Sequence, residues 1–165
     1  MRSPTPFMAL CLAALLAPGP ALADSATRVG AWTVRTYTST QPPTVSIWVS
    51  ARNGDRLGFS CPGGRPAAFY EVQAPFLGDD GTAPAEDEAL PVSWRLDARP
   101  PSAPERWGMV QTRAALAIPG RTAATLLSGL GQARTLTLRV GTRPPETFDL
   151  RGASRALRLL PCSTP

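Results

Sequence analysis

Proline and glycine interrupt this chain at short intervals, and this punctuation constrains the fold more than any other feature of the sequence. The chain has 19 proline and 14 glycine residues among its 165. Both residues disrupt the interior of a helix, whereas short strands joined by turns use them readily. The sequence therefore predicts a mainly β protein, either an antiparallel β-sandwich or a strongly bent sheet.

The clearest strand pattern lies at residues 44–51, where Val45, Ile47 and Val49 alternate with Ser46, Trp48 and Ser50. Asn53-Gly54 follows it and predicts a hairpin turn, because both residue types tolerate a positive φ. The next strand should therefore pair back in the antiparallel sense. The expected strands are residues 29–37, 44–51, 56–61, 68–73, 92–97, 107–112 with a continuation over 114–118, 134–140 and 147–150. Residues 99–104 (RPPSAP) predict a rigid connector.

Two short helices complete the expected order of elements. Residues 122–130 combine an alanine- and leucine-rich interior with Thr122 as a possible cap, and Gly129 or Gly131 can end the helix. After residue 152, apolar side chains fall at helical spacing, and Pro161 ends that pattern. These side chains are Ala153, Ala156, Leu157 and Leu160.

The first 23 residues have the pattern of a cleavable signal peptide. Arg2 supplies the positive charge, residues 7–16 form a short apolar core, and Ala21-Leu22-Ala23 matches a cleavage site. The apolar run is too short for a permanent anchor, although an uncleaved anchor is the alternative. Cys11 does not form a lipobox, because a leucine precedes it. We expect an exported chain, periplasmic or secreted, in which residues 24–165 form one β-rich domain.

Cleavage leaves two cysteines, Cys61 and Cys162. An even pair in an oxidising compartment favours a disulfide, which would close a loop of 162 − 61 − 1 = 100 residues. It would also tie the C-terminus to the body of the domain. Two free thiols or a metal pair are the alternatives, but a zinc site needs further ligands and the chain has no histidine.

Charge is distributed unevenly, and every basic residue is an arginine. Residues 24–107 have a net charge of 8 − 10 = −2, whereas residues 108–165 have 8 − 2 = +6. A basic half can meet nucleic acid, anionic lipid or an acidic glycan, and a solvated face is the alternative. We expect no nucleic-acid partner, because an exported protein rarely meets one. The candidate surface contacts are Arg134, Arg139, Arg143 and Trp48, which lies on the polar face of its strand.

Catalytic motifs are sparse. Without histidine, a Ser-His-Asp or Cys-His site cannot be built within this chain, and no nucleotide-binding loop is present. We expect no cofactor and no metal. An acidic loop is the remaining chemical candidate, either as a calcium site or simply as a solvated loop. Its carboxylates belong to Asp79, Asp80, Glu86, Asp87 and Glu88.

Several short strings resemble small exported proteins of Gram-negative bacteria, among them type VI secretion accessory proteins of the VasI/TagO kind. These strings are LGFSC at 57–61, VSWRLD at 92–97, Trp107, FDLRG at 148–152, Ala156-Leu157 and Cys162. The resemblance implies the sandwich and the pairing of the two cysteines, and it transfers no catalytic residue. It also implies an accessory role in the cell envelope.

Taken together, these features predict a non-enzymatic periplasmic binding or accessory module of the cell envelope. Its partner would be another envelope protein or an anionic envelope polymer. The alternatives are a carboxylate-based glycan hydrolase, since paired carboxylates can come from anywhere in a chain, and an enzyme inhibitor or ligand-binding module.

Overall fold

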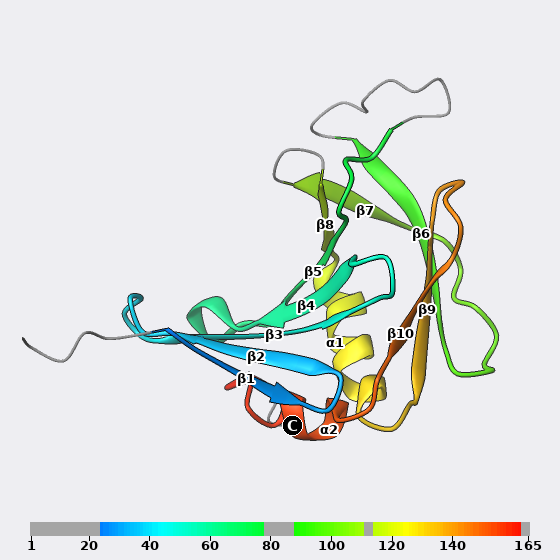
Figure 1. The fold of residues 1–165 in the computed structure, drawn as a ribbon. Helices are drawn as coiled ribbons and strands as arrows, with labels where there is room; N and C mark the ends of the chain where they lie inside the picture. Colours follow the sequence, from blue (N-terminus) through cyan, green and yellow to red (C-terminus); the bar gives the residue numbers. More distant parts are fainter. Residues whose placement is uncertain (1–23, 78–87, 111–113, 163–165) are drawn as a thin grey trace, which may run out of the picture.

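A computed structural model describes residues 24–77, 88–110 and 114–162 (Figure 1). This part of the chain forms one antiparallel sheet of ten strands and two short helices. The mainly β class and the two helices are as the sequence predicts. The sequence predicts only eight strands, because residues 29–37 and 107–118 each contain two strands that pair in the antiparallel sense. The strands are β1 (Ser25–Val29), β2 (Trp32–Tyr37), β3 (Thr44–Ser50), β4 (Arg56–Ser60), β5 (Ala67–Glu71), β6 (Ala89–Leu96), β7 (Glu105–Val110), β8 (Ala115–Ile118), β9 (Thr135–Val140) and β10 (Glu146–Asp149). The helices are α1 (Gly120–Leu130) and α2 (Ala153–Leu157), and a 3₁₀ turn covers Pro62–Gly64.

The sheet has the strand order β1-β2-β3-β4-β5-β8-β7-β6-β9-β10. Successive hairpins build β1 to β5, and a second meander of β6, β7 and β8 joins it through the pairing of β5 with β8. After α1, the chain adds β9 and β10 to the other edge of β6. The sheet bends so that β1–β5 and β6, β9 and β10 form two sides of an angle, with α1 between them (Figure 1). One continuous bent sheet is thus present, which is the second of the two expected architectures.

The inward faces of the strands build the core. Trp32 and Trp107 are fully buried, as expected for core tryptophans, and the Trp32 ring lies 6.3 Å from that of Phe59. Trp94 is only partly buried and packs at the margin of the core. The alternation in β3 holds, because Ile47 and Val49 are fully buried.

The first expected strand is wrong in extent. Residues 29–37 contain a hairpin, in which Gly30 has a φ of +65° and separates β1 from β2. The strand β1 is almost wholly exposed and therefore carries no apolar alternation for sequence reasoning to detect. The helix α1 also begins earlier than expected, so Thr122 is a buried residue within the helix and donates its hydroxyl to Glu105.

The C-terminal helix is held to the first hairpin and to β4. Gly30 and Gly152 lie back to back, and a methyl group on Gly152 would come within 2.4 Å of the Val29 carbonyl oxygen. Ala31 N–H donates to the Arg151 carbonyl at 2.9 Å. The disulfide between Cys61 and Cys162 is present, with its Cα atoms 5.7 Å apart. The expected connection of the last helix to an early strand is confirmed.

Candidate functional site

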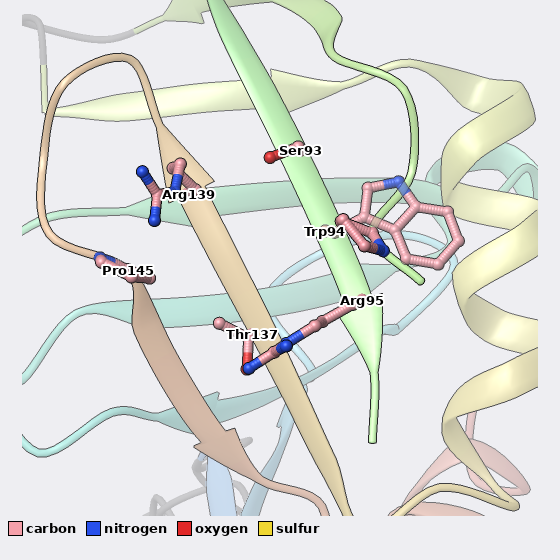
Figure 2. Close-up of a pocket in the computed structure, with 7 residues that line it drawn as sticks. Ser93, Trp94, Arg95, Thr137, Arg139 and Pro145 are labelled. Carbon is pink, nitrogen blue, oxygen red and sulfur yellow. The ribbon is translucent and has the colours of Figure 1, made fainter. Parts of the chain in front are cut away.

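The outer face of β6 and β9 carries a polar groove that includes Arg139, one of the candidate contact residues (Figure 2). In the register of the two strands, Ser93 lies opposite Arg139 and Arg95 lies opposite Thr137. Alternation directs these four side chains outward, because Val92, Leu96, Leu138 and Val140 fill the inner face of the same strands.

The groove exists because β6 is paired along only half of its length with β7. The pairing with β7 covers Ala89 to Val92, and beyond it the proline-rich connector borders β6. Ser102 N–H donates to the Trp94 carbonyl at 2.7 Å, and its hydroxyl accepts from Trp94 N–H at 3.0 Å. The expected rigid connector thus takes the place of a strand at this edge.

Two prolines from separate loops line the groove on either side. Pro101 comes from the connector, and Pro145 comes from the turn between β9 and β10. The volume of this open groove is about 320 Å³, which lies at the lower end of the range for ligand pockets. Figure 2 shows Arg139 beside Pro145, while Arg95 extends across β9 towards Thr137.

The two guanidinium groups of the groove are not neutralised within the described residues. Arg95 and Arg139 are exposed, and neither makes an ion pair within 4.0 Å of a described carboxylate. Each guanidinium presents a planar fork of N–H donors that matches a carboxylate, phosphate or sulfate group. The Ser93 hydroxyl can add a further donor to the same anion, and so can that of Thr137 when Thr147, 3.4 Å away, donates to it.

Asp97, which follows β6, and Asp149, which ends β10, are already bound to internal partners. Asp97 Oδ1 accepts the backbone N–H groups of Arg134 and Thr135, each at 2.9 Å, and these hydrogen bonds lower the pKa of Asp97. Asp149 binds Arg151, whose Nη2 lies 2.6 Å from Oδ2, and this contact lowers the pKa of Asp149. Neither carboxylate forms an ion pair with Arg95 or Arg139.

The other candidate contacts do not join this groove. Arg143 lies 4.0 Å from the buried Asp55 carboxylate and stacks on Phe76, with its Cζ atom 5.1 Å from the ring centre. Arg134 has an exposed side chain at the start of β9, and its backbone N–H binds Asp97. Arg134 and Arg143 therefore do not line the groove that contains Arg139.

Trp48 is half-buried on the outer face of β3, where it lies opposite Thr33 and Gly58. Four strands separate β3 from β6 in the sheet. The neighbouring Phe69 ring covers Gly58, since a methyl group there would come within 2.1 Å of the ring. Trp48 thus belongs to a separate aromatic surface and not to the arginine groove.

Two carboxylates approach each other on the opposite side of the sheet from the groove. Asp55 is 1% exposed, and its charge helps to raise the pKa of Glu146. Both Asp55 oxygens are occupied, because Oδ2 accepts from the Tyr70 hydroxyl at 2.7 Å and Oδ1 accepts from Gln73 N–H at 3.0 Å. A buried and fully bonded carboxylate is suited to holding turns together and poorly suited to attacking a glycan.

Most of the acidic loop lies outside the described residues, including Asp79, Asp80, Glu86 and Asp87. Glu88 is described and exposed, and its carbonyl accepts Met109 N–H at 3.0 Å. Within residues 24–77, 88–110 and 114–162, no three histidine, cysteine or acidic side chains gather as a metal site would require.

Sequence reasoning identified one member of the groove and missed Ser93, Arg95 and Thr137. The alternation of residues 92–97 and 134–140 places these three side chains on polar strand faces, which is a usable signal. The pairing of β6 with β9 could not be inferred, because α1 and two other strands intervene in the chain.

Comparison with known proteins gives no match, whether to a protein family, a curated protein or a solved structure. Neither of the two described helices is long and apolar enough to cross a membrane.

Proposed function

We propose that this protein is a non-enzymatic binding module of the cell envelope, which uses the arginine groove of β6 and β9 to hold an anionic envelope polymer. One observation carries the proposal: two guanidinium groups that form no ion pair with a described carboxylate line one groove together with two hydroxyls, while Asp97 and Asp149 are bound to internal partners. The signal-like N-terminus and the disulfide support an exported, periplasmic site of action.

The spread of the lining over several segments favours a chain-like ligand. Its lining comes from two neighbouring strands together with Pro101 and Pro145 from two separate loops. A polymer with repeated carboxylate or phosphate groups could bind both arginines at once, and the second contact would then benefit from a high effective concentration. An envelope accessory protein, the role that the VasI/TagO resemblance implies, could act by holding such a polymer.

Mapping of backbone amide shifts by NMR would locate the binding surface. The titrants are poly-γ-glutamate and polyphosphate, with uncharged dextran as the neutral control. We expect the anionic polymers to shift the amides of residues 93–95 and 137–139, and dextran to leave them unchanged. Shifts that cluster at Trp48 and Phe69 instead, or equal shifts with dextran, would contradict the proposal.

A further inference from the structure

A second cavity lies on the opposite face of β6 from the arginine groove, between β6, α1 and the proline-rich connector. Its volume is about 380 Å³, within the usual range for small-molecule sites. Helix α1 approaches β6 closely at Gly129, where a methyl group would come within 2.6 Å of Leu96 Cδ1. The cavity opens beside this contact, where Thr125 and Ser128 face the connector.

One wall of the cavity is apolar. It is formed by the indole of Trp94, the side chain of Leu96 and the ring of Pro100. Figure 2 shows the indole directed from β6 towards α1, away from Ser93 and Arg139. An aromatic face of this kind favours a planar or hydrocarbon body.

The rest of the lining is polar and carries one cation. Arg99 lines the cavity and has no described carboxylate within 4.0 Å. The hydroxyls of Thr125 and Ser128 already donate to the helix carbonyls of Arg121 and Thr125, at 3.0 Å and 2.8 Å. Their oxygens can therefore only accept hydrogen bonds. The donors to an anionic ligand are then the Arg99 guanidinium and the Ser102 hydroxyl, which accepts from Trp94 N–H and keeps its own O–H.

From this arrangement we infer that the cavity binds a small amphipathic carboxylate, with its apolar body against Trp94 and its carboxylate at Arg99. A single cation beside an aromatic wall selects one negative charge joined to a compact apolar group. The inference does not depend on the binding of a polymer in the arginine groove, because the lining of the two sites shares only Trp94.

The test uses 3-phenylpropanoate as the probe. Its binding is measured by calorimetry and by the intrinsic fluorescence of tryptophan. Its neutral amide lacks the charge, and acetate lacks the apolar body. We expect saturable binding of 3-phenylpropanoate, with the amide weaker by about tenfold, the factor expected for one charge-assisted hydrogen bond. Acetate should not bind measurably.

Three variants separate this site from other surfaces. Ser128→Phe should fill the cavity and abolish binding, whereas Ala124→Phe, at an exposed position of the same helix outside the lining, should leave it unchanged. Arg99→Gln on the connector should weaken 3-phenylpropanoate by about tenfold without affecting the amide. This variant alters no helix packing, and it keeps the test decisive if Ser128→Phe does not fold.

The inference would be overturned if 3-phenylpropanoate showed no saturable binding, or if Arg99→Gln bound it as tightly as the wild type. Replacing Arg95 and Arg139 should leave this binding intact. If the Arg95 and Arg139 variant loses polymer binding but still binds 3-phenylpropanoate, the two sites are independent. If the wild type binds no polymer but does bind 3-phenylpropanoate, the proposed function fails and this inference stands.

Discussion

The Tyr70 hydroxyl donates a 2.7 Å hydrogen bond to Oδ2 of Asp55, in the interior of the protein. Asp55 belongs to the turn between β3 and β4, while Tyr70 lies on β5. Burial, followed by the hydrogen bond to Asp55, raises the pKa of Tyr70, so the hydroxyl remains a donor at every physiological pH. This hydrogen bond holds the β3–β4 turn against β5.

Replacing Tyr70 with phenylalanine should lower the free energy of unfolding by about 1–3 kcal/mol, because Oδ2 of the buried Asp55 carboxylate then loses its hydrogen-bond donor. Urea denaturation would measure this loss. Tyr37→Phe is the matched control, since its ring stacks with Arg35 and would be retained. The two variants should differ clearly, and equal stability would show that the Asp55 contact has no net effect.

Glu146 should give a pH dependence that its amide variant lacks. Burial and the charge of Asp55 raise the pKa of Glu146, against the opposing effect of Arg143. A raised carboxyl pKa contributes stability that is present below the unfolded-state pKa, about 4.3, and is lost as pH rises through the folded-state pKa. Glu146→Gln should therefore gain stability relative to the wild type between pH 3.5 and pH 7.

Asp149→Asn provides a control of opposite sign. The hydrogen bonds from Arg151 lower the pKa of Asp149, so its stabilisation is present above the unfolded-state pKa and is lost as pH falls through the folded-state pKa. This variant should therefore lose stability relative to the wild type as pH rises. Parallel trends for the two variants would contradict the assignment of their environments.

Removing the disulfide by Cys61→Ala with Cys162→Ala should cost about 2–5 kcal/mol of unfolding free energy. The cross-link joins residues separated by 101 positions, and without it the unfolded chain gains conformational freedom. Urea denaturation with and without a reductant would measure the effect. The reductant should destabilise the wild type only, and a loss in the double variant would indicate another cause.

Gly152→Ala should destabilise the fold by about 1–3 kcal/mol, because residue 152 has a φ of +90° and faces the Val29 carbonyl. Gly131→Ala is the control, since residue 131 has helical dihedral angles and its nearest contact would be 3.5 Å away. Thermal unfolding would compare the two variants. Similar melting temperatures would show that the back-to-back packing of Gly30 and Gly152 is not required.

The sequence predicts those parts of the fold that follow from local chemistry. Alternation locates β3 because Ile47 and Val49 on one of its faces are fully buried, and Asn53-Gly54 identifies the hairpin that follows. The signal-like N-terminus and the number of cysteines predict the pairing of Cys61 with Cys162, which the structure contains. By contrast, β1 has no buried face, and alternation therefore cannot reveal it.

Contacts between distant segments set the rest of the fold and most of the candidate site. Ser93 and Arg139 meet only because β9 returns to the free edge of β6 after α1. In the sequence, Asp55 looks like an ordinary turn residue. Only the packing of β5 against it shows that it is buried. Local pattern therefore predicts which strand face is polar, but not which two polar faces become neighbours.

The most direct test of the central claim compares the affinity of poly-γ-glutamate for two double variants of equal charge. Arg95→Gln with Arg139→Gln removes the groove cations, whereas Arg65→Gln with Arg121→Gln removes two exposed arginines elsewhere. We expect the groove variant to weaken binding by about tenfold or more, with a shallower dependence on salt, and the control to change little. Equal losses in both variants would show that binding follows net charge alone and would contradict the arginine groove as the binding site.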